Sequence, residues 1–263
     1  MNKISVYIIA YNEVEKIESA INSVLWADEI ILVDSHSTDG TTEKATSMGA
    51  KVVQVDFKGF GDLRIQGVNA CQYNWIFSLD ADERCTPEAR DEILTVINDV
   101  NAHDVYFMPR KNFFMGRWIK NSGWYPNYRQ PQLFRKNTLQ YHDDAVHEGY
   151  TINSDKPAGY LTKAIWQMPF NDLGEVMHKA NRYSTLGVEK LAEKNKKTSM
   201  GRSLSRAVWV FVKHYIFKRG FLDGWPGFVI ALGNFYGTYF RYAKYYEKKM
   251  QWKLPESPPL ERE

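Results

Sequence analysis

Residues Trp75–Asp82 read Trp-Ile-Phe-Ser-Leu-Asp-Ala-Asp, an apolar run that ends in two carboxylates. The apolar run predicts a buried strand over Trp75–Leu79. Asp80 and Asp82 follow at once, and two carboxylates at a strand end can share a hard cation such as Mg²⁺ or Mn²⁺. Taken alone, the pair also fits a solvated acidic turn before a helix, because Thr86-Pro87 is a typical helix start.

Strand and helix patterns alternate on both sides of this stretch. Further strands are expected at Ile4–Ala10, Glu29–Asp34, Lys51–Phe57, Asp104–Arg110 and Gln132–Arg135. The segments between the first four strands carry helical spacing of apolar residues or helix-start residues. Strands that alternate with helices predict an α/β fold with a mainly parallel sheet covered on both faces.

Polar residues follow three of these strands. Ligands bind at the carboxyl ends of the strands in such sheets. Ala10–Glu13, Asp34–Ser37 and Asp80–Asp82 are therefore expected along one edge. Asn12 and Asp39 are also placed to cap the helices that come next.

Composition and missing motifs narrow the function. With 44% hydrophobic and 25% charged residues among 263, the chain is typical of a globular protein. It has neither the Gly-x-Gly-x-x-Gly nor the P-loop motif, which disfavours dinucleotide-binding enzymes and P-loop NTPases. Two cysteines in unrelated contexts suggest no disulfide framework. We also find no signal-peptide pattern and no apolar run long enough to cross a bilayer.

Three ordered motifs resemble those of a known family. Ser5–Glu13 (SVYIIAYNE), Asp34–Gly40 (DSHSTDG) and Leu79–Asp82 (LDAD) resemble the nucleotide-binding signatures of family 2 glycosyltransferases, whose fold is called GT-A. Arg64 stands where the family usually has an arginine that faces the nucleotide diphosphate. The resemblance covers about residues 1–150. It implies a GT-A nucleotide-diphospho-sugar transferase fold.

The resemblance also implies roles for individual residues. The positions concerned are Ala10, Tyr11, Glu13, Asp34, Arg64, Asp80 and Asp82. The first three would border the nucleobase and ribose, and Asp34 would read the base. Asp80 would face the ribose and the metal, with Asp82 as the main metal ligand. Mg²⁺ or Mn²⁺ and a UDP-sugar donor are implied. The chain departs from the usual Asp-Asp and Arg-Asn pairs, because it has Asp34-Ser35 and Arg64-Ile65.

Inverting glycosyl transfer needs a carboxylate that deprotonates the acceptor hydroxyl. Candidates lie in residues 141–148, which read YHDDAVHE. A Val-His-Glu element there resembles that of the lipopolysaccharide-core β-1,4-glucosyltransferase subgroup and favours Glu148 as the base. Asp144 is the alternative. A zinc site is disfavoured, because the spacing of the two histidines matches no standard ligand set.

The segment before these carboxylates resembles the acceptor side of the same subgroup. Its candidate acceptor-binding residues are Trp124, Tyr125, Arg129 and Arg135. Aromatic planes suit stacking on a sugar ring, and arginines suit phosphorylated core sugars. A structural hairpin with a core tryptophan is the other interpretation.

Charge divides the chain unevenly. Residues 1–193 carry a net charge of −6, whereas residues 194–253 carry +11 with many interleaved aromatic residues. This pattern suits helices lying in a membrane interface, or a helical cap on the catalytic domain. We therefore expect a catalytic domain over 1–150, a connecting segment and helix over 151–193, and a basic, aromatic helical appendage over 194–263.

These observations predict an inverting hexosyltransferase of lipopolysaccharide biosynthesis. The subgroup implies UDP-glucose as donor and a glycolipid acceptor, the heptose of the inner core, reached from the cytoplasmic face of the inner membrane. An enzyme acting on another envelope polysaccharide or on a protein is the alternative. A basic nucleic-acid-binding protein is the rival from another class, which the acidic first 193 residues disfavour.

Overall fold

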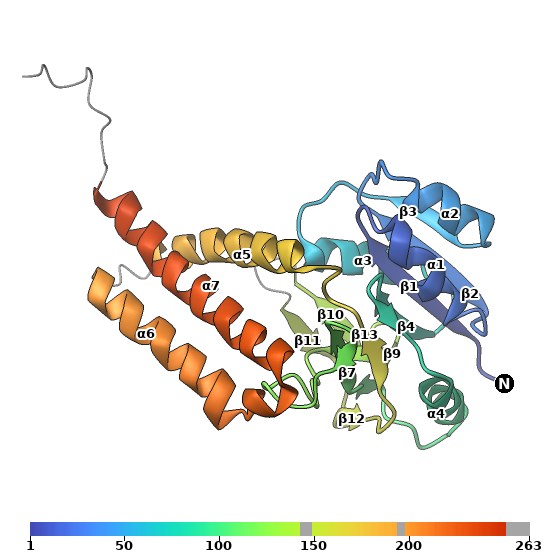
Figure 1. The fold of residues 1–263 in the computed structure, drawn as a ribbon. Helices are drawn as coiled ribbons and strands as arrows, with labels where there is room; N and C mark the ends of the chain where they lie inside the picture. Colours follow the sequence, from blue (N-terminus) through green and yellow to red (C-terminus); the bar gives the residue numbers. More distant parts are fainter. Residues whose placement is uncertain (143–148, 194–197, 251–263) are drawn as a thin grey trace, which may run out of the picture. The chain divides into compact units, whose positions relative to one another are not determined.

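The computed structural model describes residues 1–142, 149–193 and 198–250, and the chain divides into two compact units (Figure 1). The first unit is Met1–Pro169 and the second is Phe170–Glu263. The division falls later than residue 150, where the sequence suggested a boundary. Strands formed after residue 150 belong to the sheets of the first unit.

A seven-stranded sheet forms the centre of the first unit, with strand order β12-β6-β9-β4-β1-β2-β3. Its strands are β1 (Ile4–Ala10), β2 (Glu29–Asp34), β3 (Lys51–Gln54), β4 (Trp75–Asp80), β6 (Val105–Phe107), β9 (Pro131–Arg135) and β12 (Gly159–Tyr160). The first four run parallel, as the alternating pattern predicted. β9 runs antiparallel between β4 and β6, so the sheet is mixed on that side.

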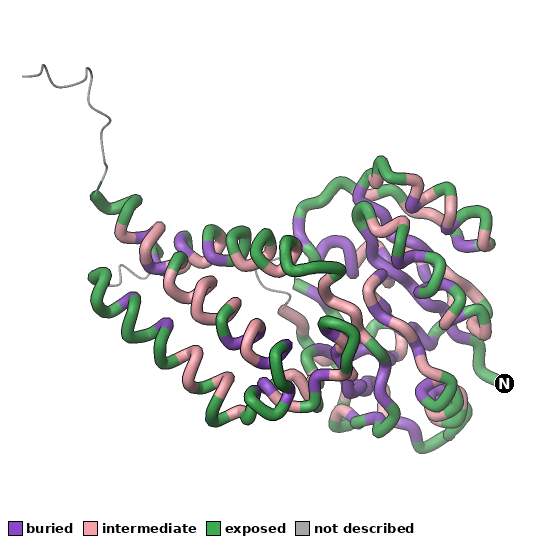
Figure 2. Tube along the Cα trace, viewed as in Figure 1, coloured by how far each residue is buried: buried purple, intermediate pink, exposed green. Residues whose placement is uncertain are grey.

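Helices cover both faces of this sheet. They are α1 (Val14–Asn22), α2 (Thr41–Ser47), α3 (Phe60–Ala70) and α4 (Pro87–Ile97). Buried residues of α1, α2 and α4 form one core with β1, and buried residues of α3 form the core on the other face. The helix α3 lies close to β1, since a Cβ atom at Gly67 would come within 2.6 Å of the Tyr7 ring. Figure 2 shows the sheet buried between these layers.

The start of α1 differs from the prediction. Asn12 does not cap this helix, because its backbone turns with a φ of 53° and its side chain accepts from the Thr38 N–H instead. The Val14 N–H donates to Asp39 Oδ2 at 3.0 Å. The loop after β2 thus supplies the cap for α1. The same hydrogen bonds connect this loop to the loop that follows β1.

Two smaller sheets complete the first unit. One has the order β5-β13-β7-β8 and the other pairs β10 with β11. Their strands are β5 (Glu83–Arg84), β7 (Arg110–Phe114), β8 (Arg117–Trp118), β10 (Leu139–Tyr141), β11 (Tyr150–Ile152) and β13 (Ile165–Gln167). The single strand predicted over Asp104–Arg110 was wrong, because the chain leaves β6 near Pro109 and begins β7 in another sheet. Proline has no N–H for a sheet ladder, and β6 already carries a bulge at Tyr106 and Phe107.

The second unit consists of helices. They are α5 (Leu173–Glu193), α6 (Met200–Val212), the π-helical turn η1 (Lys213–Phe217), the short 3₁₀ turn η2 (Gly220–Asp223) and α7 (Trp225–Met250). α7 packs against both α5 and α6. Its buried Tyr242 and Tyr245 form a core with Val188 and Leu191 of α5. Among the described helices, none is long and apolar enough to cross a membrane.

The N-cap of α4 offers a test of the fold. Thr86 Oγ accepts from the Ala89 N–H at 3.1 Å and donates to the Ala164 carbonyl at 3.0 Å. We expect Thr86→Ala to lower the free energy of unfolding by about 1 kcal/mol or more, because both bonds are lost. Thr95→Ala is the matched control, since Thr95 lies on the exposed side of the same helix and bonds only within it. Equal stability of the two variants in urea titrations would contradict the assignment.

Candidate active site

The carboxyl ends of the parallel strands bring the predicted motifs together. In the register of the sheet, Ala10 lies beside Asp34, and Ile9 lies beside Asp80. Neighbouring strands are about 4.8 Å apart, so the ends of β2, β1 and β4 span roughly 10 Å. The residues expected along one edge of the sheet therefore share that edge.

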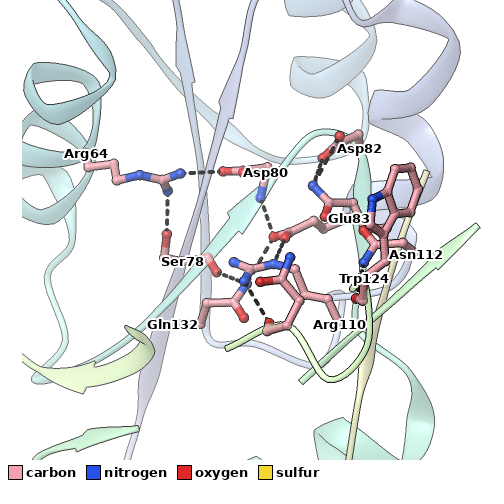
Figure 3. Close-up of polar contacts among 11 residues, drawn as sticks. Arg64, Ser78, Asp80, Asp82, Glu83, Arg110, Asn112, Trp124 and Gln132 are labelled. Atoms are coloured by element: carbon pink, nitrogen blue, oxygen red, sulfur yellow. Dashed lines mark hydrogen bonds and ion pairs between the residues drawn. The ribbon is translucent and has the colours of Figure 1, made fainter. Parts of the chain in front are cut away.

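Arg64 reaches this edge from α3, which covers one face of the sheet. Its Nη2 lies 2.9 Å from Asp80 Oδ1, and its Nη1 donates to Ser78 Oγ at 3.0 Å (Figure 3). The side chain of Arg64 is only 1% exposed. Burial raises the pKa of Asp80, but the positive charges of Arg64, Arg110 and Arg129 outweigh burial and hold that pKa below its ordinary value. Asp80 is therefore ionised near neutral pH.

Asp82 has a different environment. Gln167 Nε2 lies 3.3 and 3.4 Å from its two carboxylate oxygens. Burial, together with the negative charges of Asp80 and Glu83, raises the pKa of Asp82 to about 7. A carboxylate crowded by other carboxylates is stabilised in its charged form by a cation, so Asp80 and Asp82 fit a divalent metal.

The donor set limits which metal chemistry fits. Within the described residues, no group of three or more His, Cys, Asp or Glu side chains could hold a metal ion. Mg²⁺ and Mn²⁺ suit this arrangement, because Mg²⁺ commonly uses one or two carboxylates and completes its octahedron with water and substrate phosphates. Such an ion would supply charge to a diphosphate bound at this edge.

Sequence reasoning missed a buried ion pair directly behind the acidic turn. Glu83 is fully buried, and its Oε1 lies 2.5 Å from Arg110 Nε (Figure 3). Its Oε2 accepts from the Asp80 N–H and from Gln132 Nε2, each at 3.0 Å. Burial raises the pKa of Glu83, and the charge of Arg110 opposes that rise. The only indication in the sequence was that Glu83 is a third acidic residue at this strand end. Its partners could not be foreseen, because they come from distant strands.

The residues predicted to border the nucleoside lie at the same edge with differing exposure. Ala10 is buried at the end of β1, and Tyr11 is 61% exposed just after it. Glu13 forms an ion pair with Lys16 at 3.3 Å. The buried carboxylate of Asp34 accepts from the Ser37 N–H at 2.8 Å and from Ser37 Oγ at 2.5 Å. Asp34 therefore orders the loop after β2.

The predicted acceptor residues divide into two groups. The carbonyl of Trp124 accepts from Asn112 Nδ2 at 3.0 Å, and the Tyr125 ring packs edge-on against Trp118. Arg129 is close enough for its charge to lower the pKa of Asp80. These three residues belong to the segment before β9, and Trp124 and Tyr125 contact residues of β7 and β8.

Arg135 lies elsewhere. Its Nε is 3.1 Å from Asp104 Oδ1, and its guanidinium lies over the Trp75 ring at 4.3 Å. In the antiparallel pairing of β9 with β4, Arg135 is opposite Trp75, the first residue of β4. Asp80 is the last residue of that strand, so the structure does not bring Arg135 together with the other site residues. The two predicted bases, Asp144 and Glu148, lie outside the described residues.

A family model described as glycosyl transferase family 2 matches residues 5–165, which is more than half of the chain. The chain belongs to glycosyltransferase family 2. The resemblance drawn from its three motifs is confirmed, as are the predicted enzyme class and the GT-A fold.

Relatives of this family 2 glycosyltransferase match over nearly its whole length. An uncharacterized glycosyltransferase of Rickettsia bellii (strain RML369-C) is 31% identical over 258 residues, covering 95% of this chain and 88% of the relative. The lipopolysaccharide core biosynthesis glycosyltransferase LpsC of Rhizobium meliloti (strain 1021) is 24% identical over 258 residues, covering 93% and 92%.

A solved structure matches part of the chain. Glucosyl-3-phosphoglycerate synthase of Mycobacterium tuberculosis, in complex with Mn²⁺, UDP and glucosyl-3-phosphoglycerate, is 27% identical with a TM-score of 0.37. The match covers 41% of this chain and 44% of that chain, so this chain spans less than half the length of the solved protein.

The environment of Asp82 leads to a test of metal use. We expect Mn²⁺ to strengthen UDP binding to the unmodified protein. Asp82→Asn should abolish that enhancement, a loss of tenfold or more, because the amide cannot supply the negative charge that a hard cation needs. Isothermal titration of UDP with and without Mn²⁺ measures the effect. Asp91→Asn, on the exposed side of α4, is the control and should retain the enhancement. UDP affinity of the unmodified protein that is equal with and without metal would contradict the assignment.

Proposed function

We propose that this enzyme moves a hexose from a UDP-sugar, with UDP-glucose as the first candidate, to a glycolipid acceptor. The acceptor that we favour is the heptose of the lipopolysaccharide inner core. The observation that carries the donor side is the juxtaposition of Asp80, Asp82 and Arg64 at one sheet edge, where a metal and a diphosphate would both find charge partners.

Two observations support an anionic glycolipid acceptor. Residues 111–130 contain four Lys or Arg and no Asp or Glu, in a unit that is otherwise acidic. This stretch includes Trp124, Tyr125 and Arg129, and such a balance suits phosphorylated sugars. In addition, LpsC, whose name places it in lipopolysaccharide core biosynthesis, matches this chain along nearly its whole length and not only over the family domain.

In the proposed reaction each residue has a limited task. The cation would neutralise the departing diphosphate, and Arg64 would hold Asp80 in place toward it. Trp124 and Tyr125 would orient the acceptor sugar. Glu148 would accept the proton of the attacking hydroxyl, with Asp144 as the alternative, a role proposed from the sequence alone.

A transfer assay tests this function. The expected result is transfer of glucose from UDP-glucose to a purified heptose-containing core glycolipid in the presence of Mn²⁺. Glu148→Gln should lower turnover about a hundredfold, because a general base contributes 10²–10⁴-fold, while UDP affinity stays unchanged. Asp144→Asn is the paired variant, and the larger loss identifies the base. Transfer to another envelope polysaccharide or to a protein, with none to the core glycolipid, would replace the acceptor assignment.

A lipid-linked acceptor would be presented at a membrane surface, and the second unit has features that suit adsorption to the cytoplasmic face of the inner membrane. Large apolar side chains are exposed along α6 and around the turn before α7. They are Leu204, Val208, Trp209, Ile216, Phe217, Phe221, Leu222 and Trp225. Lys213, Lys218 and Arg219 stand among them, whereas the acidic Asp223 is buried.

Vesicle sedimentation tests the adsorption. Each cation near an anionic surface contributes about 1 kcal/mol, and inserted rings add a part that resists salt. We expect binding to vesicles that contain phosphatidylglycerol, weaker binding at high salt, and a further loss in the double variant Trp209→Ser/Phe217→Ser. Val100→Ser/Tyr160→Ser, two exposed apolar positions of the first unit, is the control and should bind normally. Protein that stays in the supernatant at low salt would overturn the adsorption proposal.

A further inference from the structure

The carboxylate of Glu83 is surrounded by hydrogen-bond donors. Its Oε1 faces Arg110 Nε at 2.5 Å, and its Oε2 faces the Asp80 N–H and Gln132 Nε2 at 3.0 Å each. Glu83, Arg110 and Gln132 are all at most 2% exposed. Buried polar groups are costly to leave unpaired, so only an acceptor with two oxygens satisfies this position.

These contacts join elements that are distant in the sequence. Glu83 begins β5, Arg110 begins β7 and Gln132 lies in β9 (Figure 3). The bond to the Asp80 N–H ties Glu83 to the backbone of the proposed metal-binding turn. The orientation of that turn therefore depends on where Glu83 is held.

Further bonds hold the rest of the same turn. Arg84 Nη1 donates to the carbonyls of Ala81 and Glu83, at 2.8 and 2.6 Å. The Asp82 carbonyl accepts from the Met168 N–H at 2.9 Å. The backbone of the turn is thus bonded on several sides, while the Asp82 carboxylate meets a neutral amide. Such rigidity suits a site that must hold a ligand in one geometry.

Arg110 also contacts the segment assigned to the acceptor. Its Nη1 donates to the Asn127 carbonyl at 3.4 Å, within the segment that carries Trp124, Tyr125 and Arg129. Two residues along β7, Asn112 donates to the Trp124 carbonyl. The same buried arginine thus contacts both the support of the metal-binding turn and the segment assigned to the acceptor.

We propose that Glu83 and Arg110 are positioning residues that couple the geometry of the Asp80–Asp82 turn to that of the acceptor segment 121–130. Substitution of Glu83 should therefore disturb both segments, although it touches only one of them. The consequence for catalysis rests on the proposed function, whereas the coupling between the two segments does not.

Glu83→Gln is the test variant. In either orientation its amide NH₂ would face a donor, because every group opposite the Glu83 carboxylate is itself a donor. Hydrogen exchange of the full chain, without ligand, should become at least tenfold faster at residues 80–83 and also at residues 121–130. In the same variant, UDP affinity in Mn²⁺ should fall at least tenfold and the acceptor KM should rise.

Glu29→Gln is the matched control. Glu29 Oε2 likewise accepts from one backbone N–H, that of Gln72, and from one side chain, that of Ser5. Glu29 lies at the first residue of β2, at the opposite end of the sheet from Asp80. This variant should leave exchange at both segments, UDP affinity and acceptor KM unchanged, and a change as large as that of Glu83→Gln would overturn the proposal.

Arg110→Lys tests the contact with Glu83 and the contact with Asn127 separately, and it serves as the test if Glu83→Gln does not fold. One ammonium group can neutralise Glu83 but cannot also reach the Asn127 carbonyl as the guanidinium does. We expect faster exchange at residues 121–130 and a raised acceptor KM, with UDP affinity in Mn²⁺ kept within about threefold. A folded variant in which both segments exchange at the unmodified rate overturns the coupling. If the unmodified protein shows no metal-dependent binding of UDP, the proposed function is refuted instead. The exchange data would still decide whether the two segments are coupled.

Discussion

Parallel pairing of β1 with both β2 and β4 is the constraint on which the site depends. Because the three strands run in one direction and in matched register, Ala10, Asp34 and Asp80 end at one edge of the sheet. Their backbones need no other device to come together. The α3 helix then contributes a positive charge at this edge. It starts after β3 and packs on one face of the sheet, so that Arg64 reaches Asp80. Close approach of α3 is possible because Gly67 presents no Cβ to the Tyr7 ring. The proposed nucleotide-sugar site would thus need no glycine-rich phosphate loop.

Much of this arrangement follows from local patterns. Apolar runs that end in Asp34 and Asp80 predict strands whose polar ends meet, and Thr86-Pro87 predicts the start of α4 with the correct cap. A helix before residue 193 and a helical segment after it were expected as well, and the structure has helices in both places. In each case the information lies within about ten residues, which is the range over which side-chain periodicity acts.

The features that escaped prediction depend on long-range geometry. Arg135 was placed with the acceptor residues because its segment resembles the acceptor side of the subgroup, but β9 runs antiparallel to β4 and places it at the far end of that strand. Glu83 and Arg110 are 27 residues apart and lie on different strands, β5 and β7, so no local pattern links them. Asn12 resembles a cap, yet its positive φ turns its side chain toward Thr38. The direction of a strand and the sign of a backbone φ angle are set by tertiary packing, which single-residue patterns do not encode.

The three acidic residues of the turn have different electrostatic partners, and this difference assigns their tasks. Glu83 is paired with Arg110 inside the protein, and Asp80 is paired with Arg64 at the rim. In the part of the chain that the structure describes, Asp82 makes no ion pair and meets the neutral amide of Gln167. Two arginines therefore compensate two carboxylates, and the pKa of the third is raised by burial and by its negative neighbours. If all three carboxylates had arginine partners, a cation would gain little there, and if none had, the turn would repel itself. The observed division leaves Asp82, at the end of the strand, without an arginine partner among the described residues, which favours the proposed binding of a divalent metal there.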